Sequence, residues 1–287
     1  MLSRVDRIQL AVPDRNEAVA TWQALFGADK VGEDGSRALN AHRTTVQAGI
    51  TLFEFLEPAG PGPVADFVEA WRGGLYGVAF SAPHVQSMAK HFDALGAAYM
   101  EERGSLVLAP GVTHGMPTTI VPEMFRAPVG HIRCAYEVTN PVADASVTSA
   151  HYAKLFGIDA ARYCPIRSEL YGYGGSLTLF NPPAQLDRVE VTNTWGEGAM
   201  NRFYQRRGPG LYMCYIETDD VPALAARLRA RNARFTDSED RPPETGLFIH
   251  PTSTHGMLMG VSRTNYAWVW SGHPELAGEG AESYAAH

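Results

Sequence analysis

The hydrophobic positions of the chain follow one order: a strand, a helix and then three strands. The stretch VDRIQLAV at residues 5–12 alternates between two faces, which predicts a strand. Asp14 then provides a helix N-cap, apolar residues follow at helical spacing, and Gly27 ends the predicted helix. Three β-rich segments complete this unit, around residues 30–32, 44–47 and 50–56.

The same order begins again three times, at Gly74, at His131 and at Gly210. The triplet Gly-Leu-Tyr that starts at Gly74 returns in the second half, where it starts at Gly210. The triplet Leu-Phe-Gly that ends at Gly27 returns in the same way and ends at Gly157. Long internal periods of this kind indicate duplicated structural units. The sequence therefore predicts an α+β fold of four tandem βαβββ units arranged in two halves.

A short motif repeats in the two halves. PGVTHGM at residues 110–116 returns as PTSTHGM at residues 251–257, each before the last strand of its half. We expect a structural turn with positive φ at Gly115 and Gly256, since histidines that repeat in both halves are more typical of a turn than of a catalytic site. These repeats predict a first domain over residues 1–126, a second over 127–263 with an enlarged linker at about 182–209, and an aromatic tail over 264–287.

Composition narrows the class of protein. The 287 residues are 45% hydrophobic and 19% charged, which is typical of a globular chain. The formal net charge of −7 argues against a nucleic-acid partner, because phosphate binding needs clustered Lys and Arg. We see no signal peptide, no apolar run long enough to cross a bilayer and no paired cysteine framework. We therefore expect a cytoplasmic protein with no membrane partner.

Four βαβββ units resemble the vicinal oxygen chelate superfamily, which includes glyoxalase I, bleomycin-resistance proteins, methylmalonyl-CoA epimerases and extradiol dioxygenases. The likeness covers about residues 1–263 and rests on VDRIQLAVPDRNEAVATWQALFG, ITLFEFLEP, GLYGVAF and the two turn motifs. The resemblance implies that paired units close into two cup-shaped half-barrels. It also implies a divalent metal on the floor of a cup, held by His on a first strand and by Glu, Gln or His on a fourth strand.

Most of the implied ligand positions carry other residues. The first half offers Arg7, Glu54, Gly77 and Thr119, and the second offers His131, Leu179, Met213 and Gly260. Only Glu54 and His131 are of the expected type, and the fixed charge of Arg7 would repel a cation. We therefore expect no cofactor. The alternative is a divalent metal at a displaced site that includes His131 and His255.

The first cup is expected to contain Arg7, Gln9 and Glu54 on one strand face. In a functional interpretation Arg7 and Gln9 bind an anionic substrate, and Glu54 removes a proton next to a carbonyl group. In the simpler interpretation Arg7 and Glu54 form a buried ion pair that only supports the structure.

The sequence favours the second cup as the catalytic site. We expect His131 as an acid/base and Arg133 as the group that holds an anionic oxygen, with Tyr215 and Glu137 beside them. The alternative is a core histidine next to a surface arginine.

Two further predictions concern aromatic residues. Tyr76 and Tyr212 are expected to point away from the cups, because they lie next to the ligand positions on alternating strands. The aromatic segment YAWVW at residues 266–270 would form an extra edge strand, cover a subunit contact or close the second cup as a lid.

Two classes of function remain open. The first is a glyoxalase- or dioxygenase-like enzyme, preferably a metal-independent isomerase or lyase that uses acid/base chemistry on a small oxygenated anion. The second is a metal-free protein that binds or sequesters a small molecule such as a drug. A third hypothesis is a divalent-metal lyase or dioxygenase with a displaced metal site near His131. In each case the partner is a small molecule, and a homodimer is left open.

Overall fold

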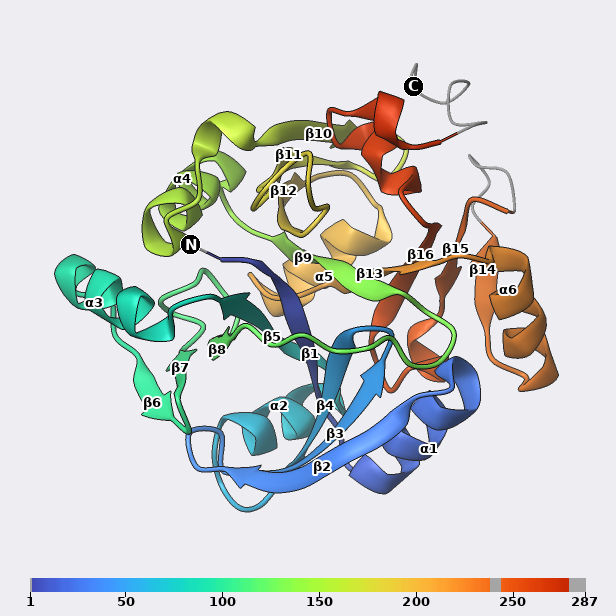
Figure 1. Cartoon of the computed structure of the whole chain (residues 1–287), viewed down its shortest axis with the longest axis horizontal. Helices are drawn as coiled ribbons and strands as arrows, with labels where there is room; N and C mark the ends of the chain where they lie inside the picture. The colour runs from blue at the N-terminus through green and yellow to red at the C-terminus, as the bar shows by residue number, and fades with distance from the viewer. Residues whose placement is uncertain (1, 238–243, 279–287) are drawn as a thin grey trace.

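Each half of the chain folds into two βαβββ units (Figure 1). The computed structural model describes residues 2–237 and 244–278. The elements of the first half are β1 (Arg4–Ala11), α1 (Arg15–Phe26), β2 (Asp29–Ser36), β3 (Ala41–Ala48), β4 (Thr51–Pro58), α2 (Pro63–Trp71), β5 (Gly74–Ala82), α3 (Val85–Leu95), β6 (Met100–Glu102), β7 (Ser105–Leu108) and β8 (Thr118–Pro122).

The second half repeats this order. Its elements are β9 (Cys134–Pro141), α4 (Ala145–Phe156), the 3-10 helix η1 (Ala160–Arg162), β10 (Cys164–Ser168), β11 (Tyr173–Leu177), β12 (Arg188–Thr194), α5 (Ala199–Arg207), β13 (Met213–Thr218), α6 (Val221–Ala230), β14 (Phe235–Asp237), β15 (Gly246–Ile249), η2 (Pro251–Ser253) and β16 (Leu258–Arg263). Two further 3-10 helices, η3 (Tyr266–Trp270) and η4 (Pro274–Leu276), follow in the tail.

The two sheets have the same topology. The first has the strand order β2-β3-β4-β1-β5-β8-β7-β6, and the second has the order β10-β11-β12-β9-β13-β16-β15-β14. In each sheet the first strands of the two units lie side by side and antiparallel, and each pairs in parallel with the fourth strand of its own unit. The prediction of four tandem units in two half-barrels is therefore confirmed.

The helices begin and end where the sequence indicates. The side chain of Asp14 caps α1 by accepting hydrogen bonds from the amides of Asn16 and Glu17. Gly27 ends α1 in the left-handed conformation, with φ of 64°. Asp144 and Gly157 play the same two roles for α4, the corresponding helix of the second half.

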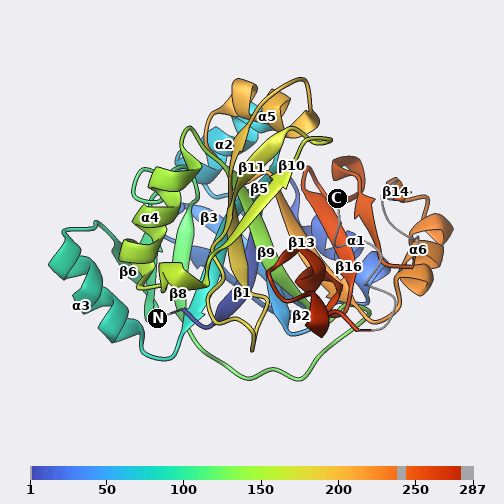
Figure 2. The same cartoon turned by 90° about the horizontal axis from the view of Figure 1, so that it is seen from above.

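The two halves share one hydrophobic core on the helix-covered faces of the sheets. Helix α1 contacts α6, and α3 contacts α4 (Figures 1 and 2). The first unit therefore packs against the fourth through their helices, and the second unit packs against the third. The opposite faces form the cups. Helix α2 packs on the face of the first sheet, and the tail packs on the face of the second.

The repeated turn motif joins the halves. Gly115 and Gly256 both have φ of 90°, as predicted. The imidazole of His114 contacts the hydroxyl of Thr148 in α4 at 3.2 Å, and that of His255 contacts the hydroxyl of Thr21 in α1 at 2.8 Å. Each turn therefore docks on the first helix of the other half, which is a structural role.

One expectation about the second half is wrong, and the structure decides against one of the three roles left open for the tail. The linker predicted at about 182–209 contains β12 and α5, because the fourth strand of the third unit comes later than Leu179. Helix α5 corresponds to α2, and the sequence pattern predicted neither helix. The tail forms no edge strand in the part that the structure describes; the buried side chains of Tyr266 and Trp268 pack on the second cup instead.

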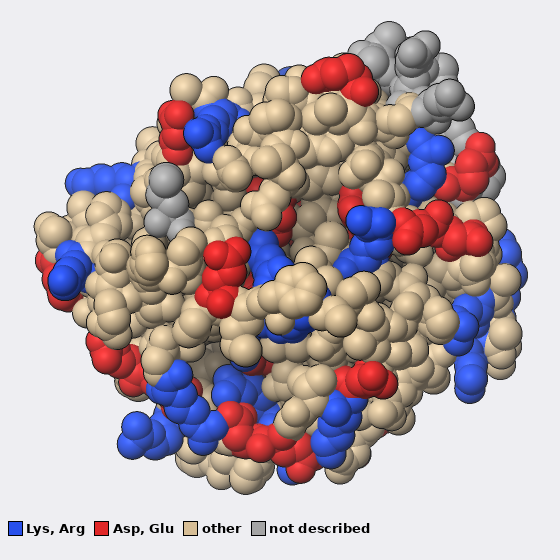
Figure 3. Space-filling view, in the orientation of Figure 1, with Lys and Arg blue, Asp and Glu red and all other residues tan. Residues whose placement is uncertain are grey.

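Charge is distributed without a dominant sign on the face shown in Figure 3, where acidic and basic side chains lie interspersed. No helix in the described ranges has the length and apolar character needed to cross a membrane.

Asp187 provides a pH-sensitive contact between the halves. Its Oδ1 accepts a hydrogen bond from the amide of Val5 in β1 at 2.7 Å. Desolvation by the surrounding protein raises the pKa of this carboxyl from 3.8 to about 7, although the Val5 amide and the Arg4 charge oppose the rise.

The unfolded chain therefore loses this proton at lower pH than the folded chain, so the contribution of Asp187 to stability falls as pH rises from about 4 to 7. We expect Asp187→Asn to raise the free energy of unfolding by roughly 2–4 kcal/mol at pH 8 and to leave it unchanged below pH 4. Urea unfolding of both proteins at the two pH values measures this. A variant that is equally destabilised at both would contradict it.

Candidate active site in the second cup

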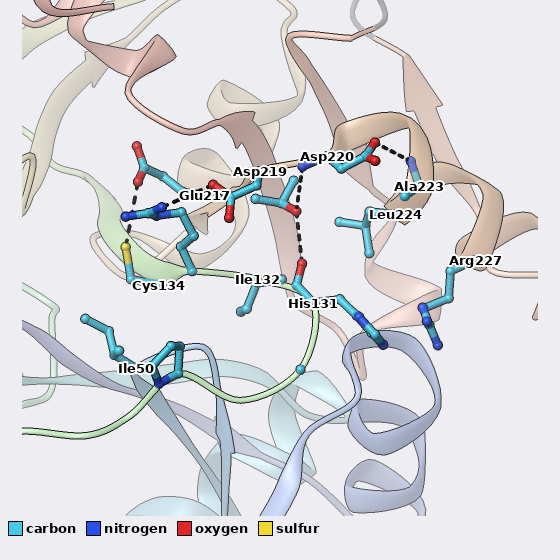
Figure 4. Close-up of a pocket in the computed structure, with 14 residues that line it drawn as sticks. Ile50, His131, Ile132, Cys134, Glu217, Asp219, Asp220, Ala223, Leu224 and Arg227 are labelled. Atoms are coloured by element: carbon cyan, nitrogen blue, oxygen red, sulfur yellow. Dashed lines mark hydrogen bonds and ion pairs between the residues drawn. The ribbon is translucent and has the colours of Figure 1, made fainter.

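His131 and Arg133 lie outside the second cup, in a surface pocket of about 590 Å³ between the inter-half linker and the start of α6 (Figure 4). The expectation that they face the cup from a strand is wrong, because β9 begins only at Cys134. The amide of His131 bonds to the carbonyl of Phe26 at 2.9 Å, which fixes the linker against α1.

The surroundings of these two residues are those of a surface pocket. Arg133 forms an ion pair with Asp219 at 3.2 Å, and its side chain is 54% exposed. Burial and the charge of Arg227 lower the pKa of His131. The His131 ring points toward Arg227 in Figure 4. Tyr215 does not line this pocket, so the predicted grouping of His131, Arg133 and Tyr215 does not form.

Three buried charged residues occupy the second cup: Glu137, Arg188 and Glu190. Glu137 is the true repeat of Arg7, since each is the fourth residue of the first strand in its half. Arg188 lies opposite Glu137 in the register of β12 and β9, and its Nε donates to Glu137 Oε2 at 2.6 Å. The side chains of Glu137 and Arg188 are 1% and 0% exposed, so this ion pair is fully buried.

Glu190 corresponds to Glu54 of the first half. Glu54 pairs with Gln9 in β1, and Glu190 pairs with Thr139, the residue of β9 that corresponds to Gln9. Sequence reasoning missed Glu190 because it placed the fourth strand at Leu179. The spacing that links Gly74 to Gly210 also links Glu54 to Glu190, so the signal was present in the sequence.

Glu190 is buried next to the Glu137–Arg188 ion pair. Burial, and then the charge of Glu137, raise the pKa of Glu190 well above its usual range. Glu190 Oε2 accepts a hydrogen bond from the Thr139 hydroxyl at 3.1 Å, and Glu190 Oε1 is buried with no hydrogen-bond partner among the described residues. The cup therefore holds two buried carboxyl groups in different surroundings, since Glu137 is paired with Arg188 and Glu190 has a raised pKa.

Arg188 keeps part of its hydrogen-bonding capacity open. Its guanidinium carbon lies 4.9 Å from the centre of the Tyr136 ring. Its Nη2 is buried and has no hydrogen-bond partner among the described residues. A buried N–H without a partner is costly, and an oxygen atom of a bound molecule would satisfy it.

Aromatic side chains and the tail close the cup. The Tyr136 hydroxyl lies 3.0 Å from that of Ser262, and the ring centres of Tyr136 and Tyr215 are 6.0 Å apart. The ring centre of Trp270 in η3 lies 6.5 Å from that of Tyr215. Of the three roles predicted for the tail, the structure therefore places it as a cover over the second cup.

The metal expected from the resemblance does not fit this cup. Tyr215 pairs with Glu137 in β9 and with Gly260 in β16. The first-strand ligand position of the fourth unit is therefore Tyr215, and not Met213 as the sequence predicted, and Gly260 is the fourth-strand position. A Cβ atom at Gly260 would collide with the Tyr215 ring, so a phenol ring fills the space above the ligand position. The guanidinium of Arg188 is also already paired with Glu137, and its fixed positive charge would repel a metal ion.

The displaced metal site is not supported by the placement of its two histidines, since the His255 imidazole bonds to Thr21 in α1. The described residues contain no cluster of three or more His, Cys, Asp or Glu side chains that could hold a metal ion.

The first cup brings Arg7, Gln9 and Glu54 together, as the pattern predicts. Arg7 Nη1 lies 2.6 Å from Glu54 Oε1, and Gln9 Nε2 donates to Glu54 Oε2 at 2.9 Å. Arg43, which the sequence did not single out, approaches Glu54 at 3.6 Å and binds Asp34 through two bonds of 2.7 Å. The charge of Glu54 is thus balanced by the guanidinium groups of Arg7 and Arg43, which agrees with the interpretation of a structural ion pair.

No protein-family model and no curated protein matches the sequence. Among solved structures, the chain is similar to a mutant of 4-hydroxymandelate synthase from Streptomyces coelicolor, with a TM-score of 0.71, 15% identity, and coverage of 99% of this chain and 96% of that one. It is also similar to a xylose isomerase-like TIM barrel/4-hydroxyphenylpyruvate dioxygenase fusion protein, with a TM-score of 0.61, 12% identity, and coverage of 92% and 49%. Together with the four βαβββ units, these similarities show that the chain has the fold of the vicinal oxygen chelate superfamily in its four-unit form.

Proposed function

We propose that the protein is a metal-independent isomerase or lyase that acts on a small oxygenated anion in the second cup. The observation that supports this proposal most is the enclosed cluster of Glu137, Arg188 and Glu190, in which a buried carboxyl group with a raised pKa adjoins an ion pair of a carboxyl group and a guanidinium. Pairs of carboxyl groups held in different protonation states by their surroundings are typical of acid/base catalysis. His131 and Arg133, outside the cup, have no part in this proposal.

The chemistry follows from the three side chains. The unpaired Nη2 of Arg188 binds an oxygen of the substrate anion. Glu137 removes a proton from the carbon next to a carbonyl group, while Glu190 gives its proton to the carbonyl oxygen, and an enol forms. If Glu137 returns the proton to the other face of that carbon and Glu190 takes back the enol proton, the carbonyl re-forms and the product is a stereoisomer. If instead a leaving group departs with its bonding electrons from the carbon on the far side of the deprotonated carbon, a double bond forms between these two carbons. Glu190 then takes back the enol proton, the proton on Glu137 passes to the leaving group, and the product is that of a lyase. Tyr215 forms one wall of the site.

Deuterium exchange tests this proposal without knowledge of the natural substrate. The protein is incubated in D₂O and EDTA with a panel of small 2-oxo and 2-hydroxy acids, and loss of the C–H signal next to the carbonyl is followed by proton NMR. We expect exchange on at least one acid, reduced about 10²- to 10⁴-fold in Glu190→Gln. Gln preserves the size and neutrality of the protonated acid, so the variant should fold.

Arg133→Ala is the matched control, because Arg133 is an exposed cation outside the cup. It should exchange at the rate of the wild-type protein. Equal rates in wild type and Glu190→Gln, or exchange that disappears with EDTA, would overturn the proposal.

A further inference from the structure

The first cup contains a second cavity, separate from the cluster in the second cup. It has a volume of about 270 Å³ and lies between the start of α2, the β6–β8 strands and the floor formed by β1 and β5. Most of its lining is apolar and includes Leu39, Met100, Val107 and Leu108. None of the described residues that line it is charged. This lining excludes an anionic ligand of the kind proposed for the second cup.

Gln9 presents an acceptor to this cavity. Its amide nitrogen donates to Glu54 Oε2 at 2.9 Å, which fixes the orientation of the amide and turns Oε1 away from Glu54. The opposite strand carries Gly77, where a Cβ atom would lie 2.5 Å from Gln9 Oε1. The absence of a side chain at Gly77 therefore leaves room for this amide oxygen.

Tyr76 and Thr119 bring two hydroxyl groups to the same cavity. Both residues are buried, and both line the cavity. The prediction that Tyr76 points away from the cup is wrong. The register of β1 and β5 shifts from Gln9–Gly77 to Leu10–Leu75, and this bulge removes Tyr76 from the regular alternation.

Gln9, Tyr76 and Thr119 therefore add a few polar groups to a largely apolar cavity, which is the usual composition of a small-molecule site. We propose that the first cup binds an uncharged molecule with one ring and a hydroxyl group, such as a simple phenol. The ring contacts the apolar lining, and the hydroxyl donates to Gln9 Oε1 and accepts from Thr119 or Tyr76. Glu54 does not attract a cation here, because Arg7 and Arg43 already neutralise it.

Phenol, benzoate and toluene are suitable probes, titrated into the wild-type chain and followed by proton–nitrogen NMR. We expect phenol to shift the amides around Gln9, Tyr76 and Thr119. We also expect toluene, which lacks the hydroxyl, and benzoate, which is charged, to bind at least about 5-fold more weakly. Thr119→Val and Tyr76→Phe keep the shape of the cavity while removing one hydroxyl each. At least one should weaken phenol binding about 5-fold, and neither should alter toluene binding.

Glu190→Gln separates the two sites, since it should leave phenol binding unchanged whatever its effect on exchange in the second cup. The inference is overturned if phenol shifts no amides in the first cup, if benzoate binds as well as phenol, or if both hydroxyl variants bind phenol like the wild type.

Discussion

Replacing Arg188 by methionine is expected to lower the free energy of unfolding by about 3–5 kcal/mol at pH 8. The guanidinium is fully buried and bonds to Glu137 at 2.6 Å. Methionine fills a similar volume but leaves the Glu137 carboxylate in the cup without its cation, beside Glu190. Urea unfolding followed by tryptophan fluorescence measures the loss.

The double variant Arg188→Met with Glu137→Leu is the control, because it removes both charges. Replacing both partners of a buried ion pair with apolar residues costs much less than removing one of them. The double variant should therefore be more stable than Arg188→Met alone. Equal losses in the single and double variants would show that the ion pair is not what stabilises the cup.

Alanine at Gly115 is expected to destabilise the chain by about 2–4 kcal/mol. Gly115 has φ of 90°, which side chains rarely adopt, and a Cβ atom there would collide with the carbonyl oxygen of Pro209 in the other half. Because the colliding atom belongs to the backbone, the contact between the halves must shift. Thermal unfolding reports the change.

Gly111 gives a matched control within the same turn. A Cβ atom at Gly111 would have no heavy atom within 4 Å, and its φ is not in the positive range. We therefore expect Gly111→Ala to change stability by less than about 1 kcal/mol. If both variants unfold alike, the turn does not join the halves in the way described.

The sequence predicted the fold because duplication repeats the same signals. The helix that starts at Asp14 and ends at Gly27 recurs with Asp144 and Gly157, and the conformation of Gly115 recurs at Gly256. Capping residues, glycine turns and alternation are local properties, so a single chain displays them directly.

The site was harder to predict because it depends on register. The sequence pattern aligned His131 with Arg7 on the first strand of each half. Because β9 begins only at Cys134, the residue that corresponds to Arg7 is Glu137, and this match was missed. An irregular segment after Leu179 hid β12, and with it Arg188 and Glu190. The bulge at Tyr76 could not be read from alternation, because a bulge interrupts the two-residue period.

The most direct test of the acid/base account is the infrared difference spectrum between wild type and Glu190→Gln at pH 7. Carboxyl groups other than Glu190 are common to both proteins, so their bands cancel in the difference spectrum. The account predicts that the carbonyl stretch of a protonated carboxylic acid is present in the wild type and lost in the variant. A difference confined to carboxylate bands would show that Glu190 is ionised and would contradict the account.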